Sequence, residues 1–180
     1  MSKKVLVIST SLRNHSNSAA LADAFAEGAR QSGNTVEQIS LQNKQIGFCK
    51  GCLACLKTGS CVQKDDAIEI VRKMHDADVL VFASPIYYYE MSGQMKTLLD
   101  RANSLYGSDY AFTDVYLLTA AAEDAEGVDR RAIFGLEGWI ECFERAHLAG
   151  SVFAGGVNGA GEIEGHAALQ QAREMGAAIA

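Results

Sequence analysis

Short apolar runs alternate along the chain with stretches in which apolar residues recur every three or four positions. Residues 5–8 are continuously apolar and predict a buried strand over about residues 3–9. Leu21, Phe25 and Ala29 then recur at a spacing of four and predict a helix over about residues 18–31. The same alternation predicts strands at about 35–41, 78–83, 115–120 and 148–154, and helices starting near 65, over about 92–103, across 136–143 and across 169–179.

Five strands that alternate with five helices predict an α/β fold, a doubly wound five-stranded parallel sheet with helices on both faces. The common strand order for this arrangement is 2-1-3-4-5, which places the first and third strands side by side. Their connections leave in opposite directions, so the crevice at their carboxyl ends is the expected ligand site. The length of 180 residues fits one domain over residues 1–180.

The first loop at this crevice covers residues 9–22 and is rich in hydroxyl and amide side chains. It contains one arginine, Arg13, and no acidic residue, and it leads into the first predicted helix. Backbone N–H groups and the dipole at a helix N-terminus favour an anion, so we interpret the loop as a phosphate cradle. The alternative is an ordinary capped turn between strand and helix. The loop has no glycine, which excludes a dinucleotide fingerprint and a P-loop.

The second loop at the crevice, residues 84–90, holds the only proline of the chain, Pro85, and three consecutive tyrosines. Pro85 fixes its own φ and favours an extended Ser84. Ile86, Tyr87 and Tyr88 are then expected to present backbone amides and flat side chains to a planar ligand. The alternative is that these aromatic side chains pack beneath a helix or at a contact between subunits.

Four of the five cysteines form a compact group with the spacing Cys49-x2-Cys52-x2-Cys55-x5-Cys61. This spacing suits one [4Fe–4S] cluster, whereas the cysteine pairs of a structural zinc site usually lie farther apart. A thiol–disulfide couple and four reduced thiols without a cofactor are the competing interpretations. The fifth cysteine, Cys142, is predicted to be a small buried hydrophobic residue within a helix.

Charge and hydropathy restrict the partners of the chain. The net charge of −6 gives no electrostatic support for nucleic-acid binding, and no apolar run approaches membrane-spanning length. The apolar run after Lys3 and Lys4 is too short for a signal peptide. We therefore expect a cytoplasmic, reducing setting with no nucleic-acid or membrane partner, where cysteines are thiols or metal ligands rather than disulfides.

These segments together resemble the flavodoxin-like NAD(P)H-dependent FMN reductases and quinone reductases, in the branch that includes iron–sulfur flavoproteins. Residues 7–13 with Ser16-Asn17-Ser18 are similar to the FMN phosphate loop of that family, although Thr10 and Leu12 replace its usual glycine and proline. Residues 49–66 resemble its cysteine segment running into Asp-Asp. Residues 84–87 with 93–101 resemble its flavin-ring loop and helix, and residues 155–162 resemble its last strand-to-helix turn.

The resemblance implies that FMN is the cofactor, and it implies which residues surround it. The expected cofactor-binding residues are Ser9, Ser11, Arg13, Ser16, Asn17, Ser18, Pro85, Ile86, Tyr87, Tyr88, Thr119 and Ala121. Because a flavin carries the redox chemistry itself, no side chain is expected to be catalytic, and none is assigned as a metal ligand.

The implied activity is that of an FMN-dependent oxidoreductase that passes a hydride from NAD(P)H through FMN to a quinone, an aromatic compound or another acceptor. The resemblance also implies a homodimer or higher homo-oligomer. The resemblance leaves open whether this chain holds a [4Fe–4S] cluster, because relatives carry the cysteine segment both with and without one. Two other functions stay open: an electron carrier that combines FMN with this cluster, and a non-enzymatic flavodoxin-fold binding protein with a thiol switch.

Overall fold

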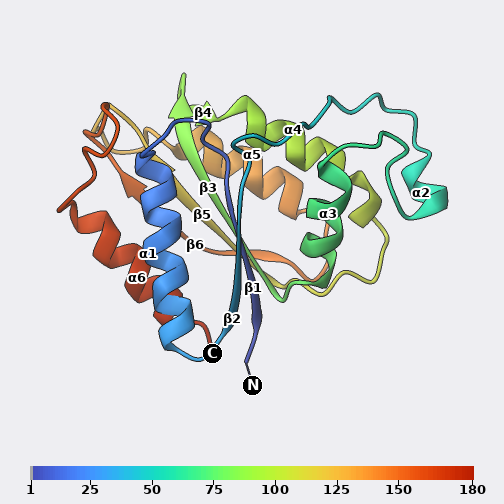
Figure 1. The fold of residues 1–180 in the computed structure, drawn as a ribbon, viewed down its shortest axis with the longest axis horizontal. Helices are drawn as coiled ribbons and strands as arrows, with labels where there is room; N and C mark the ends of the chain where they lie inside the picture. Colours follow the sequence, from blue (N-terminus) through green and yellow to red (C-terminus); the bar gives the residue numbers. More distant parts are fainter. Residues whose placement is uncertain (1) are drawn as a thin grey trace.

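The computed structural model describes residues 2–180 and contains a six-stranded sheet with helices on both sides (Figure 1). The strands are β1 (Lys4–Ser9), β2 (Thr35–Ser40), β3 (Val79–Tyr87), β4 (Glu90–Met91), β5 (Asp114–Ala120) and β6 (His147–Ala154). The helices are α1 (Asn17–Gln31), α2 (Cys55–Thr58), α3 (Ala67–Asp76), α4 (Gly93–Arg101), the 3₁₀ helix η1 (Ala102–Leu105), α5 (Arg130–Ile140) and α6 (Ala167–Ala177).

Five of the strands are parallel and lie in the order β2-β1-β3-β5-β6. This confirms the predicted order, because β5 and β6 are the fourth and fifth of the strands that the sequence predicts. The central pair brings Ser9 at the end of β1 opposite Ala83 in β3. The chain leaves β1 toward α1 on one face and leaves β3 toward α4 on the other, so the expected crevice forms between them.

Alternate side chains of each buried strand enter two separate cores. Val5 and Val7 of β1 pack with α1 and α6, whereas Leu6 and Ile8 pack with α3, α4 and α5. This is why the first and third strands are continuously apolar, since both of their faces are covered. In Figure 1, α1 and α6 lie together on one side of the sheet, and α3, α4 and α5 lie on the other.

Helices α1 and α6 pack backbone to backbone through two glycines. A Cβ atom at Gly28 would come within 1.9 Å of the carbonyl oxygen of Arg173, and one at Gly176 within 2.1 Å of that of Phe25. Any side chain at either position would force the helices apart. This close contact holds the turn before α6 beside the start of α1, at the site end of the sheet.

The structure differs from the sequence-based expectations in three places. Strand β3 continues through Pro85 to Tyr87 and turns back into β4, so residues 84–91 form a hairpin rather than an open loop. The cysteine connection contains the short helix α2. The prediction for Cys142 is wrong: it lies just beyond the end of α5 and is exposed. Its hydropathy favoured burial, but the helix ends before it.

Candidate functional site

A cavity of about 350 Å³ lies at the carboxyl ends of β1, β3 and β5. This is within the range of roughly 300–1,000 Å³ that is typical of small-molecule sites. Four segments border it: the β1–α1 loop, the β3–β4 hairpin, the end of β5 and the turn after β6. The lining residues are Ser11, Arg13, Ser16, Asn17, Ser18, Pro85, Ile86, Tyr87, Tyr88, Ala120, Ala121, Ala122, Val157 and Asn158.

The start of α1 forms a polar wall of the cavity. Ser16 caps the helix, and its hydroxyl accepts a hydrogen bond from the backbone N–H of Ala19 at 3.3 Å. The hydroxyls of Ser16 and Ser18 lie 3.1 Å apart, and both side chains are buried. The first N–H groups of a helix lack partners within the helix. This wall therefore offers hydrogen-bond donors and the positive end of a helix dipole to a bound anion.

Arg13 is the only charged residue among the described residues that line the cavity. Its Nη1 donates to the carbonyl oxygen of Asn158 at 2.6 Å, which joins the first loop to the turn after β6. Arg13 is exposed, and no carboxylate is among the residues that line the cavity. The electrostatics of the lining thus favour an anionic group near α1.

Asn17 holds the turn after β6 rather than presenting a free amide to the cavity. Its Nδ2 donates to the carbonyl oxygens of Gly159 at 2.9 Å and Val157 at 3.3 Å. Its Oδ1 accepts from the backbone N–H of Ile163 at 3.2 Å. With both ends of its amide engaged, Asn17 lines the cavity and fixes the position of the facing turn.

Buried hydroxyls join the two strands that border the crevice. The hydroxyl Oγ1 of Thr10 donates to the carbonyl oxygen of Ala83 at 3.0 Å. Thr10 Oγ1 also lies within hydrogen-bond distance of Ser92 Oγ, at 3.0 Å. The backbone N–H of Ser92 donates to Ser84 Oγ at 2.9 Å, and Ser92 caps α4. Thr10, which departs from the usual glycine of the family loop, therefore fixes β3 and the start of α4 to β1.

The tip of the β3–β4 hairpin borders the mouth of the cavity. Tyr88 and Tyr89 have φ angles of 51° and 66°, in the left-handed region that non-glycine residues avoid. This two-residue turn with both residues at positive φ suits the twist of a hairpin, although Asn-Gly is the usual sequence. Tyr89 lies against Arg131, with 5.6 Å between the guanidinium carbon and the ring centroid, whereas Tyr88 is 98% exposed.

Two predicted site residues do not line this cavity. Thr119 points into the protein, where its fully buried hydroxyl donates to Asp129 Oδ2 at 2.9 Å. Ser9 borders a neighbouring cavity, and its buried Oγ has no hydrogen-bond partner among the described residues. Asn158 was missed by the sequence reasoning. The glycine-rich turn over residues 155–165 marked its segment but not the residue.

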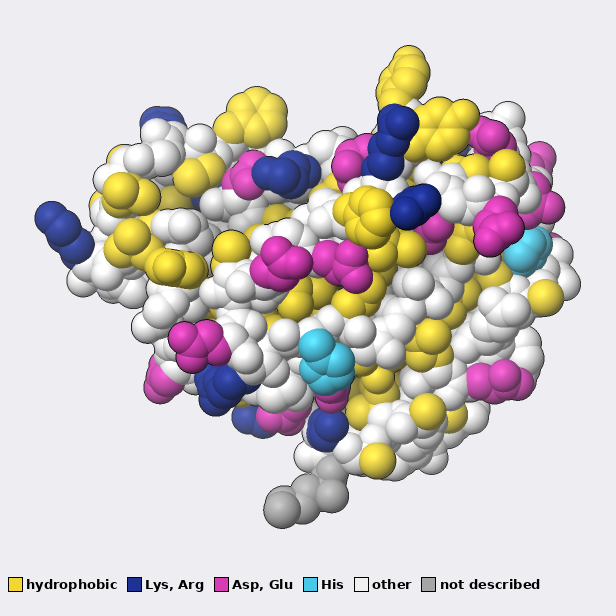
Figure 2. Space-filling model, turned by 180° about the vertical axis from the view of Figure 1, so that it is seen from behind, with side chains coloured by type: hydrophobic (Ala, Val, Ile, Leu, Met, Phe, Trp, Pro, Cys, Tyr) yellow, Lys and Arg dark blue, Asp and Glu magenta, His cyan; other side chains and the backbone are white. Residues whose placement is uncertain are grey.

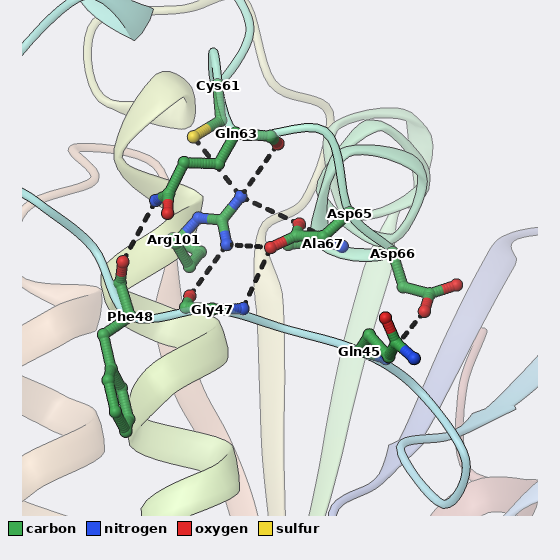
Figure 3. Close-up of polar contacts among 9 residues, drawn as sticks. All are labelled: Gln45, Gly47, Phe48, Cys61, Gln63, Asp65, Asp66, Ala67 and Arg101. Atoms are coloured by element: carbon green, nitrogen blue, oxygen red, sulfur yellow. Dashed lines mark hydrogen bonds and ion pairs between the residues drawn. The ribbon is translucent and has the colours of Figure 1, made fainter.

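The cysteine segment lies on the far side of α4 from β1 and is fastened at its base by Arg101 (Figure 3). The Arg101 side chain is completely buried and pairs with Asp65 through two hydrogen bonds of 2.5 and 2.9 Å. It also donates to the carbonyl oxygens of Gly47 at 2.8 Å and Gln63 at 3.3 Å, and to Cys61 Sγ at 3.3 Å. One guanidinium thus joins residues before and after the cysteines.

The four thiols of this segment have different surroundings. Cys49 and Cys52 are exposed, whereas Cys55 and Cys61 are partly buried. Burial raises the pKa of the Cys61 thiol, but hydrogen bonds from the backbone of Gln63 and from Arg101 leave that pKa below its usual value. Within residues 2–180, no three cysteine, histidine or acidic side chains are gathered as a metal site would require.

Hydrophobic side chains are exposed on the same segment. Phe48 is 80% exposed, Leu53 and Val62 are each 57% exposed, and Leu56 is 47% exposed. In Figure 2, which shows the molecule from behind, this protruding part carries a group of hydrophobic atoms at its surface.

No helix within residues 2–180 is long and apolar enough to cross a membrane.

Several known proteins are similar to this chain in sequence. An iron–sulfur flavoprotein of Archaeoglobus fulgidus is 39% identical over 98 residues, which cover 54% of this chain and 44% of that protein. An iron–sulfur flavoprotein of Methanosarcina thermophila is 28% identical over 84% of this chain and 77% of its own length. The chain spans about half the length of the first curated relatives that it matches.

Solved structures share the fold. An NAD(P)H:quinone oxidoreductase from Methanothermobacter marburgensis superposes with a TM-score of 0.73 at 19% identity, over 98% of this chain and 96% of that one. Residues 3–132 match the family described as NADPH-dependent FMN reductase, and these residues include the β1–α1 loop, the cysteine segment and the β3–β4 hairpin. The chain therefore belongs to the NADPH-dependent FMN reductase family.

Proposed function

We propose that this chain is an FMN-dependent oxidoreductase that takes a hydride from NAD(P)H and delivers reducing equivalents to a quinone, an aromatic compound or another acceptor. The observation that carries the proposal is the composition of the cavity. Its polar wall at the start of α1 contains one cation and no acid, and it faces the hairpin of Pro85 to Tyr88 across a single space. This division matches a ligand with an anionic end and a flat end, as FMN has.

The residues present fit FMN at both ends. Ser11, Ser16, Ser18 and Arg13 would hold the phosphate together with the first N–H groups of α1. Small side chains at residues 120–122 leave room opposite the hairpin for a planar ring. When bound, the flavin supplies the redox chemistry, and the protein binds it, orients it and controls access to it.

The chemistry of the electron acceptor is inferred from the residues at the open side of the cavity. Tyr87 and Tyr88 are exposed at its mouth and offer flat apolar surfaces to a second planar molecule. A quinone or another aromatic acceptor fits this chemistry, and the structural relative from Methanothermobacter marburgensis is named as a quinone oxidoreductase.

We also propose a homodimer or higher homo-oligomer, because tyrosines exposed beside a site are typical of interfaces. Light scattering that shows only a monomer at working concentration would contradict this assembly.

The first test is a visible spectrum of protein purified without oxygen, recorded before and after addition of NAD(P)H. Two flavin bands that bleach on addition, followed by reoxidation with a quinone, support the proposal. A protein that lacks flavin and fails to take up added FMN would refute both flavin-based functions. The non-enzymatic thiol-switch protein would then be the function to test.

The phosphate assignment is tested by comparing FMN with riboflavin, which lacks the phosphate. Arg13→Gln should weaken FMN binding by about tenfold or more, because a hydrogen bond to a charged group is worth about 1.5–3 kcal/mol, and it should leave riboflavin binding unchanged. Arg30→Gln, in the last turn of α1 and away from the cavity, is the matched control and should change neither. Equal losses for both ligands would show that Arg13 does not bind the phosphate.

A second candidate function is an electron carrier in which FMN works with a [4Fe–4S] cluster on Cys49, Cys52, Cys55 and Cys61. The hydrogen bonds that two of these sulfurs accept favour it, and so does the naming of the curated relatives as iron–sulfur flavoproteins. The donor set has the right chemistry and number for such a cluster. Iron and acid-labile sulfide in protein purified without oxygen, with slow NAD(P)H oxidation, would favour this function over the reductase.

A further inference from the structure

The cysteine segment is a loop that is closed at its base by one buried side chain. Arg101, at the end of α4, bonds to Gly47 on the incoming side and to Gln63 and Asp65 on the outgoing side (Figure 3). Removing one partner of a buried ion pair is strongly destabilising, because it leaves a charge without compensation. The base of the loop is therefore firmly held, whereas residues 48–53 beyond it are exposed.

Two of the four sulfurs are held against this rigid base. Arg101 Nη2 donates to Cys61 Sγ at 3.3 Å, and Asn103 Nδ2 donates to Cys55 Sγ at 3.3 Å. Both donors come from the α4–η1 segment, although the two cysteines are separated in the sequence by the end of α2 and the turn after it. Cys49 and Cys52 are exposed, and the sulfur of Cys49 accepts a hydrogen bond from the backbone N–H of Gly51 at 3.5 Å rather than from this base.

Two glycines between the cysteines adopt the left-handed backbone conformation. Gly51, between Cys49 and Cys52, has a φ of +64° and open space where a side chain would be. Gly59, between Cys55 and Cys61, has a φ of +70° and is equally unobstructed. Two of the four sulfurs are thus held by donors at the end of α4, and the other two lie exposed on the same segment.

We propose that Arg101 and Asn103 are positioning residues that hold Cys61 and Cys55 as two ligands of an iron–sulfur cluster and raise the reduction potential of that cluster. The proposal rests on the second candidate function above. Hydrogen bonds to cluster or cysteine sulfur stabilise the more negative, reduced form, and they are one of the factors that set the potential. Partners of metal ligands also fix the orientation of those ligands.

The same helix connects this site to the flavin crevice. Helix α4 begins at the cap residue Ser92, which is bonded to Thr10 and Ser84 beside the crevice, and it ends at Arg101. Nine residues of α-helix span roughly 13 Å, because each residue rises about 1.5 Å. The positions of the two sites relative to each other are therefore set by one short, capped element.

The test uses the full chain with its flavin, reconstituted without oxygen with iron and sulfide. Iron and sulfide content, the electron paramagnetic resonance spectrum and the midpoint potential of the cluster are measured for the wild type, Asn103→Ala and Arg101→Lys. Thr97→Ala, a neutral change at a half-buried position of α4 whose hydroxyl bonds only to the carbonyl of Gly93 in the same helix, is the control for the potential. Cys142→Ser, outside the segment, is the control for iron content.

The expected result is that Asn103→Ala keeps the full iron content but has a more negative midpoint potential, while both controls match the wild type. Arg101→Lys should lower both the potential and the iron content, because lysine cannot join both sides of the base. Unchanged potentials in both variants, with a cluster present, would overturn this inference and leave the electron-carrier function intact. A wild-type chain that takes up no iron would overturn both, without affecting the flavin site.

Discussion

Asn17, in the first turn of α1, is hydrogen-bonded through its side-chain amide to Gly159, in the turn that precedes α6, with 2.9 Å between Nδ2 and the carbonyl oxygen. This contact joins the start of α1 to the turn after β6, which both line the cavity, and α1 also packs closely on α6. The wall formed by Val157 and Asn158 thus depends on a residue that is 140 positions away from Val157 in the sequence.

We predict that Asn17→Ala weakens FMN and riboflavin binding together, each by about tenfold, because it removes buried hydrogen bonds worth about 0.5–1.5 kcal/mol each. The cause would be displacement of the turn after β6 rather than loss of a phosphate contact. Quenching of flavin fluorescence on titration measures both affinities. Asn14→Ala, an exposed amide in the same loop, is the control. A loss confined to FMN would instead mean that Asn17 contacts the phosphate.

Thr10→Val should lower the free energy of unfolding by about 1–3 kcal/mol, because the substitution is nearly isosteric but removes both buried hydrogen bonds of the Thr10 hydroxyl, to the carbonyl of Ala83 and to the hydroxyl of Ser92. Urea denaturation followed by circular dichroism measures the change. The exposed Thr35→Val, at the start of β2, should stay within about 0.5 kcal/mol of the wild type. Equal stability of the two variants would remove the structural role given to Thr10.

Tyr88→Asn should stabilise the fold and impair the reaction with a quinone. Asparagine tolerates the left-handed backbone conformation, which costs other residues roughly 1–2 kcal/mol, so the melting temperature should rise. Loss of the exposed ring at the cavity mouth should lower kcat/KM for the quinone. Tyr106→Asn is the matched control, because Tyr106 is also exposed but has an ordinary φ of −62°. Higher stability with unchanged kcat/KM would separate Tyr88 from acceptor binding.

His75 should make stability depend on pH between neutral and mildly acidic conditions. Its pKa is raised, first by the hydrogen bond to Asp76 at 2.8 Å and also by Asp109 at 3.0 Å, although partial burial opposes this. A raised pKa means that its contribution is complete below the unfolded pKa of about 6.5 and is lost as the pH rises through the folded pKa.

The melting temperatures of the wild type and His75→Gln should therefore differ more at pH 5.5 than at pH 8.5. The effect should stay below about 1 kcal/mol, because solvent screens these partly exposed pairs. A difference that grows with increasing pH would contradict the assignment of the raised pKa.

The sequence predicted the sheet and most of the cavity lining because both depend on local patterns. Continuous apolar runs identify strands buried on both faces, and parallel strands must present their carboxyl ends at one edge. Polar residues that follow such strands therefore meet at the crevice. The two loops that supply much of the lining were identified in this way, and the resemblance to the FMN reductases implied the individual residues within them.

Local patterns failed where the direction of a side chain or the end of an element decided the outcome. Thr119 lies beside the cavity in the sequence, but strand alternation turns its hydroxyl inward to Asp129. Cys142 has the hydropathy of a core residue, yet α5 ends at Ile140 and leaves it exposed.

The sequence by itself determined the strand order, the location of the crevice and the presence of four closely spaced cysteines, because these follow from periodicity, connectivity and composition. The tertiary structure alone decided that Arg101 closes the cysteine loop, that Asn17 holds the turn after β6, and that Thr10 joins β1 to α4. Each of these contacts joins residues far apart in the chain. Their partners are chosen by packing in space, which no local spacing of residue types records.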